Sequence, residues 1–215
     1  MNLPELFDLQ NKTAIVSGGG NGIGKACCLM LARFGANVVV ADLKTEDAKA
    51  VVDEIASDGG QALAVSCNVL KDDDLTNLVD KTLEKFGALH ILVNNVGGGG
   101  AGRENPDQIT VEQFAHVFQL NVFSMWRLSQ LCAPHMKKAG YGSIINMSSM
   151  SSINNSPAIS AYASSKAKES LACRRAAQIA SSRNRSDLGI SSFMAGRTRL
   201  LESVAEGSRL PAGDI

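Results

Sequence analysis

The chain has 215 residues, enough for one domain of ordinary size with a substantial core. Hydrophobic residues make up 45% and charged residues 20% of it, a balance typical of globular proteins. Basic and acidic residues both number 21, and this zero net charge argues against a nucleic-acid or anionic-membrane partner. No apolar run approaches the roughly 20 residues of a membrane span, and the polar N-terminal segment lacks a signal-peptide core. We therefore expect a cytoplasmic protein without a membrane partner.

Short apolar, β-branched runs alternate with longer amphipathic stretches. The runs predict strands at residues 12–17, 37–41, 62–66, 90–93 and 143–147. Apolar positions at helical spacing predict helices from about residue 23, around 48–55 and 75–86, and over 111–136. Strands and helices that alternate in this way form a parallel sheet with helices on both faces, so we predict a doubly wound α/β fold.

The cysteines and histidines form no recognisable disulfide or metal pattern. The five cysteines are odd in number and lack a CxxC spacing, which indicates reduced thiols, most of them in the core. A catalytic cysteine remains an alternative. The three histidines are scattered, so the sequence predicts no metal ligands. The residues concerned are Cys27, Cys28, Cys67, Cys132, Cys173, His90, His116 and His135.

A glycine-rich turn over residues 17–24, Ser-Gly-Gly-Gly-Asn-Gly-Ile-Gly, joins the first predicted strand to the first helix. Glycines let the backbone approach a pyrophosphate closely, and the helix N-terminus offers free N–H groups and a positive dipole end. The position between a strand and a helix favours a nucleotide site over the alternative, a flexible turn.

Asp42 ends the second predicted strand, about 20 residues beyond the glycines, where an acidic residue accepts hydrogen bonds from an adenosine ribose. A carboxylate there would repel a 2′-phosphate, and no basic residue lies in the turn or directly beside Asp42, although Lys44 is near. The sequence therefore favours NAD over NADP. The alternative for Asp42 is a helix cap or a solvated loop aspartate.

Tyr162 and Lys166 are four residues apart, so a helix would place them on the same face. A free phenol titrates near pH ~10, and a neighbouring ammonium stabilises its ionised form, which suits it to proton transfer. The alternative is an ordinary exposed pair on a helix.

Two further polar positions stand out near the predicted carboxyl edge of the sheet. Ser149 follows the fifth strand, where a hydroxyl can hold a substrate oxygen, although Ser148, Ser151 and Ser152 are rivals. Asn121 is the only amide on the apolar stripe of the long helix. A buried amide is costly without hydrogen bonds, so Asn121 either holds a backbone group or a water, or is a helix-kinking core asparagine.

Together these residues resemble the short-chain dehydrogenase/reductase family over roughly residues 10–170. The order and spacing carry the resemblance, and small departures are Val96, Asn68 and Ser17, where that family more often has alanine, aspartate and threonine. The matching positions are Gly18, Gly22, Gly24, the Asn94-Asn95-Val96-Gly97 segment, Asn121, Ser149, Tyr162 and Lys166.

The resemblance implies a role for each matching residue. Tyr162 would be the general acid or base, and Lys166 would lower its pKa and grip the nicotinamide ribose. Ser149 would orient the reacting hydroxyl or carbonyl, Asn121 would anchor a proton-relay water, and Asn94 would support the cofactor pocket. The residues expected to bind NAD are Ser17, Gly18, Asn21, Gly22, Ile23, Gly24, Asp42, Asn68, Val69, Asn94, Val96, Gly97, Tyr162 and Lys166.

Within that family the asparagine-glycine run at residues 94–100, the segments at 120–124 and 128–131 and the Tyr162 motif are similar to bacterial 7α-hydroxysteroid dehydrogenases. The implied reaction is oxidation of a bile-acid 7α-hydroxyl to a ketone with NAD⁺. Other short-chain alcohols, sugar alcohols and 3-oxoacyl thioesters remain alternative substrates. The resemblance also implies a homo-oligomer, a dimer or tetramer, that pairs through the 111–136 helix and the Tyr162 helix.

The last part of the chain departs from the family pattern. Family members continue with a sixth strand, a Pro-Gly turn, a substrate-covering helix and a seventh strand, whereas Ala195-Gly196-Arg197 follows the candidate strand at residues 190–194. From Ser181 onward strand and helix periodicity is weak, and arginine replaces lysine. We therefore divide the chain into a Rossmann-type catalytic domain at 1–180 and an atypical tail at 181–215, in which the C-terminal strands and substrate helix are truncated or atypical.

One hypothesis for this tail is out-of-frame translation, because the codons of Ala-Gly-Arg, shifted by one base, can encode Pro-Gly. The coding DNA tests it, since an alternative frame must then restore the missing turn and strand. The other hypothesis is a natural short variant with a disordered tail. If the sixth and seventh strands are missing, sheet surface is exposed and turnover is lost. Two non-catalytic alternatives follow: a nucleotide-binding remnant, and a subunit that only pairs with full-length partners.

Overall fold

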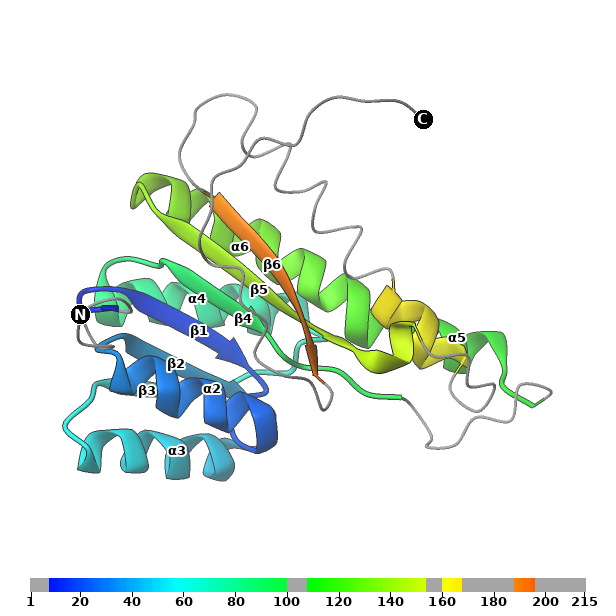
Figure 1. Ribbon diagram of the computed structural model, residues 1–215, viewed down its shortest axis with the longest axis horizontal. Coiled ribbons are helices and arrows are strands. Elements are labelled where there is room, and N and C mark those ends of the chain that lie inside the picture. Colours follow the sequence, from blue (N-terminus) through cyan, green and yellow to red (C-terminus); the bar gives the residue numbers. More distant parts are fainter. Residues whose placement is uncertain (1–7, 100–107, 154–159, 168–187, 196–215) are drawn as a thin grey trace.

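The computed structural model describes residues 8–99, 108–153, 160–167 and 188–195. Six parallel strands form one twisted sheet in the order β3-β2-β1-β4-β5-β6 (Figure 1). The strands are β1 (Thr13–Ser17), β2 (Asn37–Asp42), β3 (Ala62–Ser66), β4 (Ile91–Asn94), β5 (Gly142–Ser149) and β6 (Leu188–Ala195).

Helices cover both faces of the sheet and connect its strands. They are α2 (Gly22–Arg33), α3 (Thr45–Ser57), α4 (Asp72–Phe86), α5 (Val111–Phe118) and α6 (Ser124–Lys138), with a π-helical turn η1 (Gln119–Phe123) and a 3₁₀ turn η2 (Met150–Ser152). Residues 160–167 are also helical. The predicted doubly wound α/β fold is confirmed.

Alternation along each strand produces two core layers, one on each side of the sheet. In β1, Ala14 and Val16 pack with residues of α2 and α3, whereas Ile15 packs with residues of α4 and α6. All three are completely buried. Since both faces of the sheet are covered, its central strands read as continuous apolar runs, which is the pattern that predicted them.

The predicted boundaries of the first five strands agree with the observed ones to within two residues. β6 contains the candidate strand that the sequence offered at residues 190–194 and extends beyond it at both ends. β6 pairs in parallel with all eight residues of β5, from Gly142 opposite Leu188 to Ser149 opposite Ala195. Pairing with a neighbouring strand supplies its backbone hydrogen bonds, which a search for side-chain periodicity cannot detect. The segments 168–187 and 196–215, with the proposed domain boundary, lie outside the described residues.

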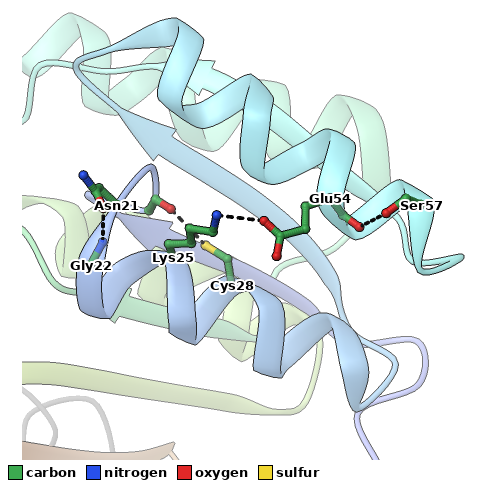
Figure 2. Close-up of polar contacts among 7 residues, drawn as sticks. Asn21, Gly22, Lys25, Cys28, Glu54 and Ser57 are labelled. Atoms are coloured by element: carbon green, nitrogen blue, oxygen red, sulfur yellow. Dashed lines mark hydrogen bonds and ion pairs between the residues drawn. The ribbon is translucent and has the colours of Figure 1, made fainter.

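The helical spacing of Ile23 and Met30 suggested that both side chains face the core, but helix α2 buries a different face. Ile23 and Met30 are more than half exposed, and Gly24 and Cys28 are buried instead. The small side chains face inward because the start of α2 lies directly against the glycine turn. Across the helix pair, Lys25 Nζ lies 2.8 Å from Glu54 Oε2 on α3 (Figure 2), an exposed ion pair worth about 0–1 kcal/mol.

The cysteines among the described residues are free, and three of the four are buried. Burial raises the pKa of the Cys28 thiol to about 12 and that of Cys67 to about 11, and it raises the pKa of Cys132 as well. Thiols held protonated in this way are poor nucleophiles, which agrees with the predicted role as core residues. Cys173 lies outside the described residues.

His90 joins β1 to β4 at the edge of the sheet opposite the strand carboxyl ends. Its Nδ1 atom accepts a hydrogen bond of 3.0 Å from the Thr13 backbone N–H, and its side chain is buried. Burial and, secondarily, the charge of Lys12 lower the pKa of His90. The neutral ring is therefore the form that the folded protein requires.

We expect this ring to make stability depend on pH. Because the folded pKa is lowered, the unfolded chain takes up a proton at His90 more readily than the folded chain does. The stabilisation by the neutral ring is then complete above about pH 6.5 and is lost as the pH falls below it. Urea unfolding followed by circular dichroism should show a smaller fall in unfolding free energy for His90→Gln than for wild type. The exposed His116→Gln is the control, and an equal fall in all three proteins would contradict the assignment.

Candidate active site

The strand order reverses between β1 and β4, because β2 and β3 extend the sheet on one side and β4 to β6 on the other. In open parallel sheets a crevice forms at such a reversal, beyond the carboxyl ends of the strands. The glycine turn, the Asn94–Gly99 segment and Ser149 all follow carboxyl ends of strands at this edge. The sequence-predicted site residues therefore converge on one edge of the sheet.

The glycine turn packs so tightly that several of its positions leave no room for a side chain, and Gly18 and Gly24 are two examples. Gly18 has a φ of +66°, in the left-handed region that favours glycine. A Cβ atom at Gly24 would lie 2.0 Å from the Gly18 carbonyl oxygen and 2.6 Å from Asn95 Nδ2. At the start of α2, Asn21 Oδ1 accepts a hydrogen bond of 2.7 Å from Gly22 N (Figure 2), and the first N–H groups of a helix have no carbonyl partner within the helix itself.

Ser17 and Asn95 hold this turn against the end of β4. Asn95 Nδ2 donates to the carbonyl oxygens of Ser17, at 3.2 Å, and of Gly18, at 3.0 Å. The Ser17 hydroxyl accepts from Asn95 N at 3.1 Å and from Val96 N at 3.4 Å. These bonds fix the backbone at the point where the two strands diverge.

Asp42 closes the turn from the side of β2. Its Oδ2 atom accepts from Gly20 N at 2.9 Å and its Oδ1 atom from Lys44 N at 3.0 Å. The carboxylate thus holds the backbone of the glycine turn and of the loop that follows β2, a role that the sequence analysis did not assign to Asp42. Each oxygen has a second lone pair, and the residue is only partly buried, so the carboxylate keeps capacity for a further donor.

Asn68 and Val69 follow β3 at the same edge. Asn68 Oδ1 accepts from Leu70 N at 3.0 Å, and its backbone N–H donates to Asp74 Oδ2 at 2.8 Å. Val69 is buried in the core layer of α4 and α6. These bonds show that Asn68 stabilises the turn after β3. Ile23, another residue expected at the cofactor, lies exposed in the first turn of α2.

Asn94 belongs to a buried polar group behind the site. Its Nδ2 atom donates to Asn146 Oδ1 on β5 at 2.8 Å and to the Ser129 hydroxyl on α6 at 3.2 Å. The Ser129 hydroxyl in turn donates to the Met125 carbonyl oxygen at 2.8 Å. These bonds tie the end of β4 to both neighbouring elements, which fits the expected supporting role of Asn94.

Asn121 lies in η1, the π-helical turn that interrupts the predicted 111–136 helix. It is completely buried. Its Oδ1 atom accepts from Gly98 N at 2.9 Å, and its Nδ2 atom donates to Gly98 O at 3.0 Å and to the Ser165 hydroxyl at 2.8 Å. Both amide hydrogens are used, so this side chain holds backbone, and the helix is distorted where it does so.

Lys166 is 3% exposed, which rules out an ordinary exposed pair. Its Nζ atom donates to the Met147 carbonyl oxygen at 2.8 Å and lies 5.9 Å from the centre of the Tyr162 ring. A Cβ atom at Gly97 would lie 2.8 Å from Lys166 Nζ and 3.3 Å from Asn121 Oδ1. Gly97, Asn121, Tyr162 and Lys166 therefore form one compact cluster beside the glycine turn.

Ser149 and its rival serines take different places. The Ser149 hydroxyl accepts from Ser151 N at 3.2 Å and lies 3.3 Å from the Ser151 hydroxyl, so it caps η2 while remaining partly accessible. Ser148 is buried, and its hydroxyl donates to the Lys166 carbonyl oxygen at 3.2 Å. Of the two, Ser149 is the one that a substrate can reach.

Three residues with evident structural roles at the site escaped the sequence reasoning about individual side chains: Asn95, Asn146 and Ser165. Each contacts a residue distant in sequence, and sequence spacing alone does not report such contacts. A weak signal existed for Asn146, because a polar residue within an apolar strand requires a partner.

In the part of the chain that the structure describes, no group of three or more histidine, cysteine or acidic residues could hold a metal ion. No helix of that part is long and apolar enough to cross a membrane.

Comparison with known proteins agrees with this geometry. The family model for short chain dehydrogenases matches residues 12–184. The chain belongs to the short chain dehydrogenase family. The matched region contains the glycine turn, Asp42, the Asn94–Gly99 segment, Asn121 and the Tyr162 helix.

Individual relatives resemble the chain over most of its length. The 7α-hydroxysteroid dehydrogenase of Escherichia coli K12 is 44% identical over 162 residues, which cover 75% of this chain and 62% of that protein. The cyclohexanol dehydrogenase of an Acinetobacter species is 35% identical over 73% of this chain and 62% of its own length. A solved structure of a 7α-hydroxysteroid dehydrogenase with NADH and 7-oxo glycochenodeoxycholic acid superposes with a TM-score of 0.81. It shares 39% identity and covers 90% of this chain and 73% of that one.

These shares mean that the chain spans less than two thirds of the length of the curated relatives it matches.

Proposed function

We propose that this chain is the cofactor-binding and catalytic part of an NAD-dependent dehydrogenase that interconverts a 7α-hydroxyl of a steroid and the ketone. The observation that carries the proposal is the cluster in which the buried Asn121 and Lys166 lie against Gly98 and Gly97, with the partly buried Tyr162 beside Lys166. It lies at the carboxyl edge of the sheet, beside a turn suited to a pyrophosphate. Nucleotide site and proton-transfer group are thus adjacent.

In the proposed oxidation, the Tyr162 phenolate oxygen takes the hydroxyl proton of the alcohol, and the carbon-bound hydrogen leaves as hydride. NAD⁺, when bound, supplies the hydride acceptor, so that the products are a ketone, NADH and a proton. Ser149 donates a hydrogen bond to the reacting oxygen and orients it. Lys166 supplies a fixed positive charge near the phenol. In the reverse reaction Tyr162 returns the proton.

The chain's own residues fit a dinucleotide at this edge. The N–H groups at the start of α2 suit a pyrophosphate, and the excluded Cβ at Gly24 marks a turn that only glycine can make. Because Gly97 has no side chain, Lys166 Nζ has room beside it, and Lys166 is the residue that we expect to bond the nicotinamide ribose. Asp42 keeps lone pairs for ribose hydroxyls and opposes a 2′-phosphate. The NADH in the related solved structure supports the same cofactor for this chain.

The steroid substrate is supported by the relatives rather than by a pocket. Both the E. coli protein and the solved structure carry the name 7α-hydroxysteroid dehydrogenase. The described residues include the catalytic edge, whereas the segments expected to cover a substrate fall outside them. We therefore extend the substrate class to this chain as part of the proposal, together with Ser149 as its oxygen-binding residue and Asn121 as the anchor of a relay water.

We further propose a cytoplasmic homo-oligomer, a dimer or tetramer, without nucleic-acid or membrane partners. Exposed apolar side chains on the long helix, Val111 at 79% and Phe123 at 59%, support a protein partner for this face. Light scattering coupled to size exclusion should give a multiple of the 22.6 kDa chain mass. A single monomer mass would remove this part of the proposal.

The catalytic assignment makes a sharp prediction, because the chain has two tyrosines. With NAD⁺ the purified protein should oxidise a 7α-hydroxysteroid and not its 7β epimer, followed as NADH absorbance. Tyr162→Phe should lower kcat by about 10²- to 10⁴-fold, the usual contribution of a general acid or base. NADH binding should remain.

Tyr141→Phe is the matched control. It removes the other phenol, which lies in an exposed position beside Lys12, and should leave kcat unchanged. Turnover by Tyr162→Phe at the wild-type rate would exclude Tyr162 as the proton-transfer residue. Equal rates on both epimers would exclude the 7α assignment but not the dehydrogenase.

Asp42 should set the preference for NADH over NADPH. Asp42→Asn removes the charge and keeps an acceptor for Gly20 N, and we expect NADH affinity to fall about tenfold while NADPH affinity rises. A hydrogen bond to a charged group contributes about 1.5–3 kcal/mol, and each 1.4 kcal/mol is tenfold in affinity. Energy transfer from Trp126, the sole tryptophan, to bound cofactor measures both affinities. The exposed Asp53→Asn should change neither, and an unaltered cofactor ratio in Asp42→Asn would refute the role.

A further inference from the structure

We infer that Ser165 is a positioning residue of the site. Through its hydrogen bond to Asn121, it sets how closely the Tyr162 helix, residues 160–167, packs on Gly97 and Gly98 and how that helix is rotated. The inference rests on the proposed function, because it concerns how Tyr162 and Lys166 are presented to cofactor and substrate. It assigns to a serine inside the Tyr-Ala-Ser-Ser-Lys segment a role distinct from that of its neighbours.

The Ser165 hydroxyl both accepts and donates a hydrogen bond. It accepts from Asn121 Nδ2 at 2.8 Å and donates to the Tyr162 carbonyl oxygen at 2.7 Å. The side chain is completely buried, whereas the adjacent Ser164 is exposed. The hydroxyl therefore lies between the amide of η1 and the backbone of Tyr162, with no water needed to bridge them.

The bond to Asn121 distinguishes this serine from an ordinary helical one. A serine hydroxyl often bonds the carbonyl oxygen of the preceding helical turn, and that bond alone has only a local effect. Here the second bond connects two elements that are 44 positions apart in the sequence. Asn121 is itself fixed by its two bonds to the Gly98 backbone. A continuous path thus runs from Gly98 through Asn121 and Ser165 to Tyr162.

The space around Lys166 shows why this path matters. Lys166 Nζ bonds Met147 O, and it lies only 2.8 Å from the position that a Cβ atom at Gly97 would take. Its carbonyl oxygen is held by Ser148. A small rotation of the helix would displace the ammonium and the Tyr162 ring together, because both side chains project from the same short helical segment. The hydrogen bond between Ser165 and Asn121 opposes this rotation on the side of the helix that faces η1.

The test compares Ser165→Ala with Ser164→Ala, which removes the neighbouring exposed hydroxyl from the same helix. Three quantities are measured in the full chain: NADH affinity from Trp126 energy transfer, kcat and KM for a 7α-hydroxysteroid, and the urea midpoint of unfolding. For Ser165→Ala we expect NADH affinity to fall about threefold to tenfold and kcat to fall about tenfold or more. These are the losses that follow when one hydrogen bond of ordinary strength no longer orients the reacting groups. KM for the steroid should stay within about twofold, since Ser165 does not touch the substrate.

Ser165→Cys provides a second variant in case Ser165→Ala folds poorly. It keeps a polar group at the same position, somewhat larger than the hydroxyl and a weaker donor and acceptor, so kcat and NADH affinity should fall between wild type and Ser165→Ala. Ser164→Ala should match wild type in all three measurements.

The outcomes separate the two proposals. If wild type binds NADH and turns over substrate, and Ser165→Ala changes only the unfolding midpoint, Ser165 is merely structural and the inference is overturned. An equal effect of Ser164→Ala would overturn it as well. If wild type neither binds NADH nor oxidises an alcohol, the proposed function is overturned, and the inference that rests on it falls too.

Discussion

The reversal of strand order between β1 and β4 is the constraint on which the rest of this site depends. Where the two strands diverge, their backbone groups lose strand partners and must be satisfied otherwise. Ser17 and Asn95 supply those bonds, and they leave the glycine turn and the Gly97–Gly98 segment facing each other. The proposed nucleotide site lies here, where small residues and the N–H groups at the start of α2 come together.

The distortion of the long helix at Asn121 follows from the same arrangement. A buried amide without hydrogen bonds would cost about 1–3 kcal/mol, and three bonds to Gly98 and Ser165 remove that cost. A π-helical turn is rare, and π-turns occur frequently at functional sites. Here it supports a backbone segment on one side and the Tyr162 helix on the other. One polar side chain therefore connects the Gly98 backbone, through Ser165, to Tyr162, the proposed proton-transfer residue.

The polar side chains behind the site form hydrogen bonds with backbone carbonyl oxygens as well as with other side chains. Lys166 bonds the Met147 carbonyl oxygen, Ser148 bonds the Lys166 carbonyl oxygen, and Asn94 bonds Asn146 and Ser129. Backbone acceptors are fixed by the sheet, so they orient a lysine more rigidly than a flexible acidic side chain would. Rigid support of this kind is what orientation-dependent catalysis requires.

The sequence by itself determined the layers of this protein and pointed to candidate site residues that the structure brings to one edge of the sheet. Apolar runs buried on both faces predict parallel strands, and the spacing of Gly18, Asp42 and Tyr162 with Lys166 identifies the family pattern. Only the tertiary structure decided which side chains hold one another. Ser165 meets Asn121 because η1 and the Tyr162 helix pack together, and β6 takes its place in the sheet by pairing with β5 along its whole length. Both are contacts between distant segments, and local periodicity carries no information about such contacts.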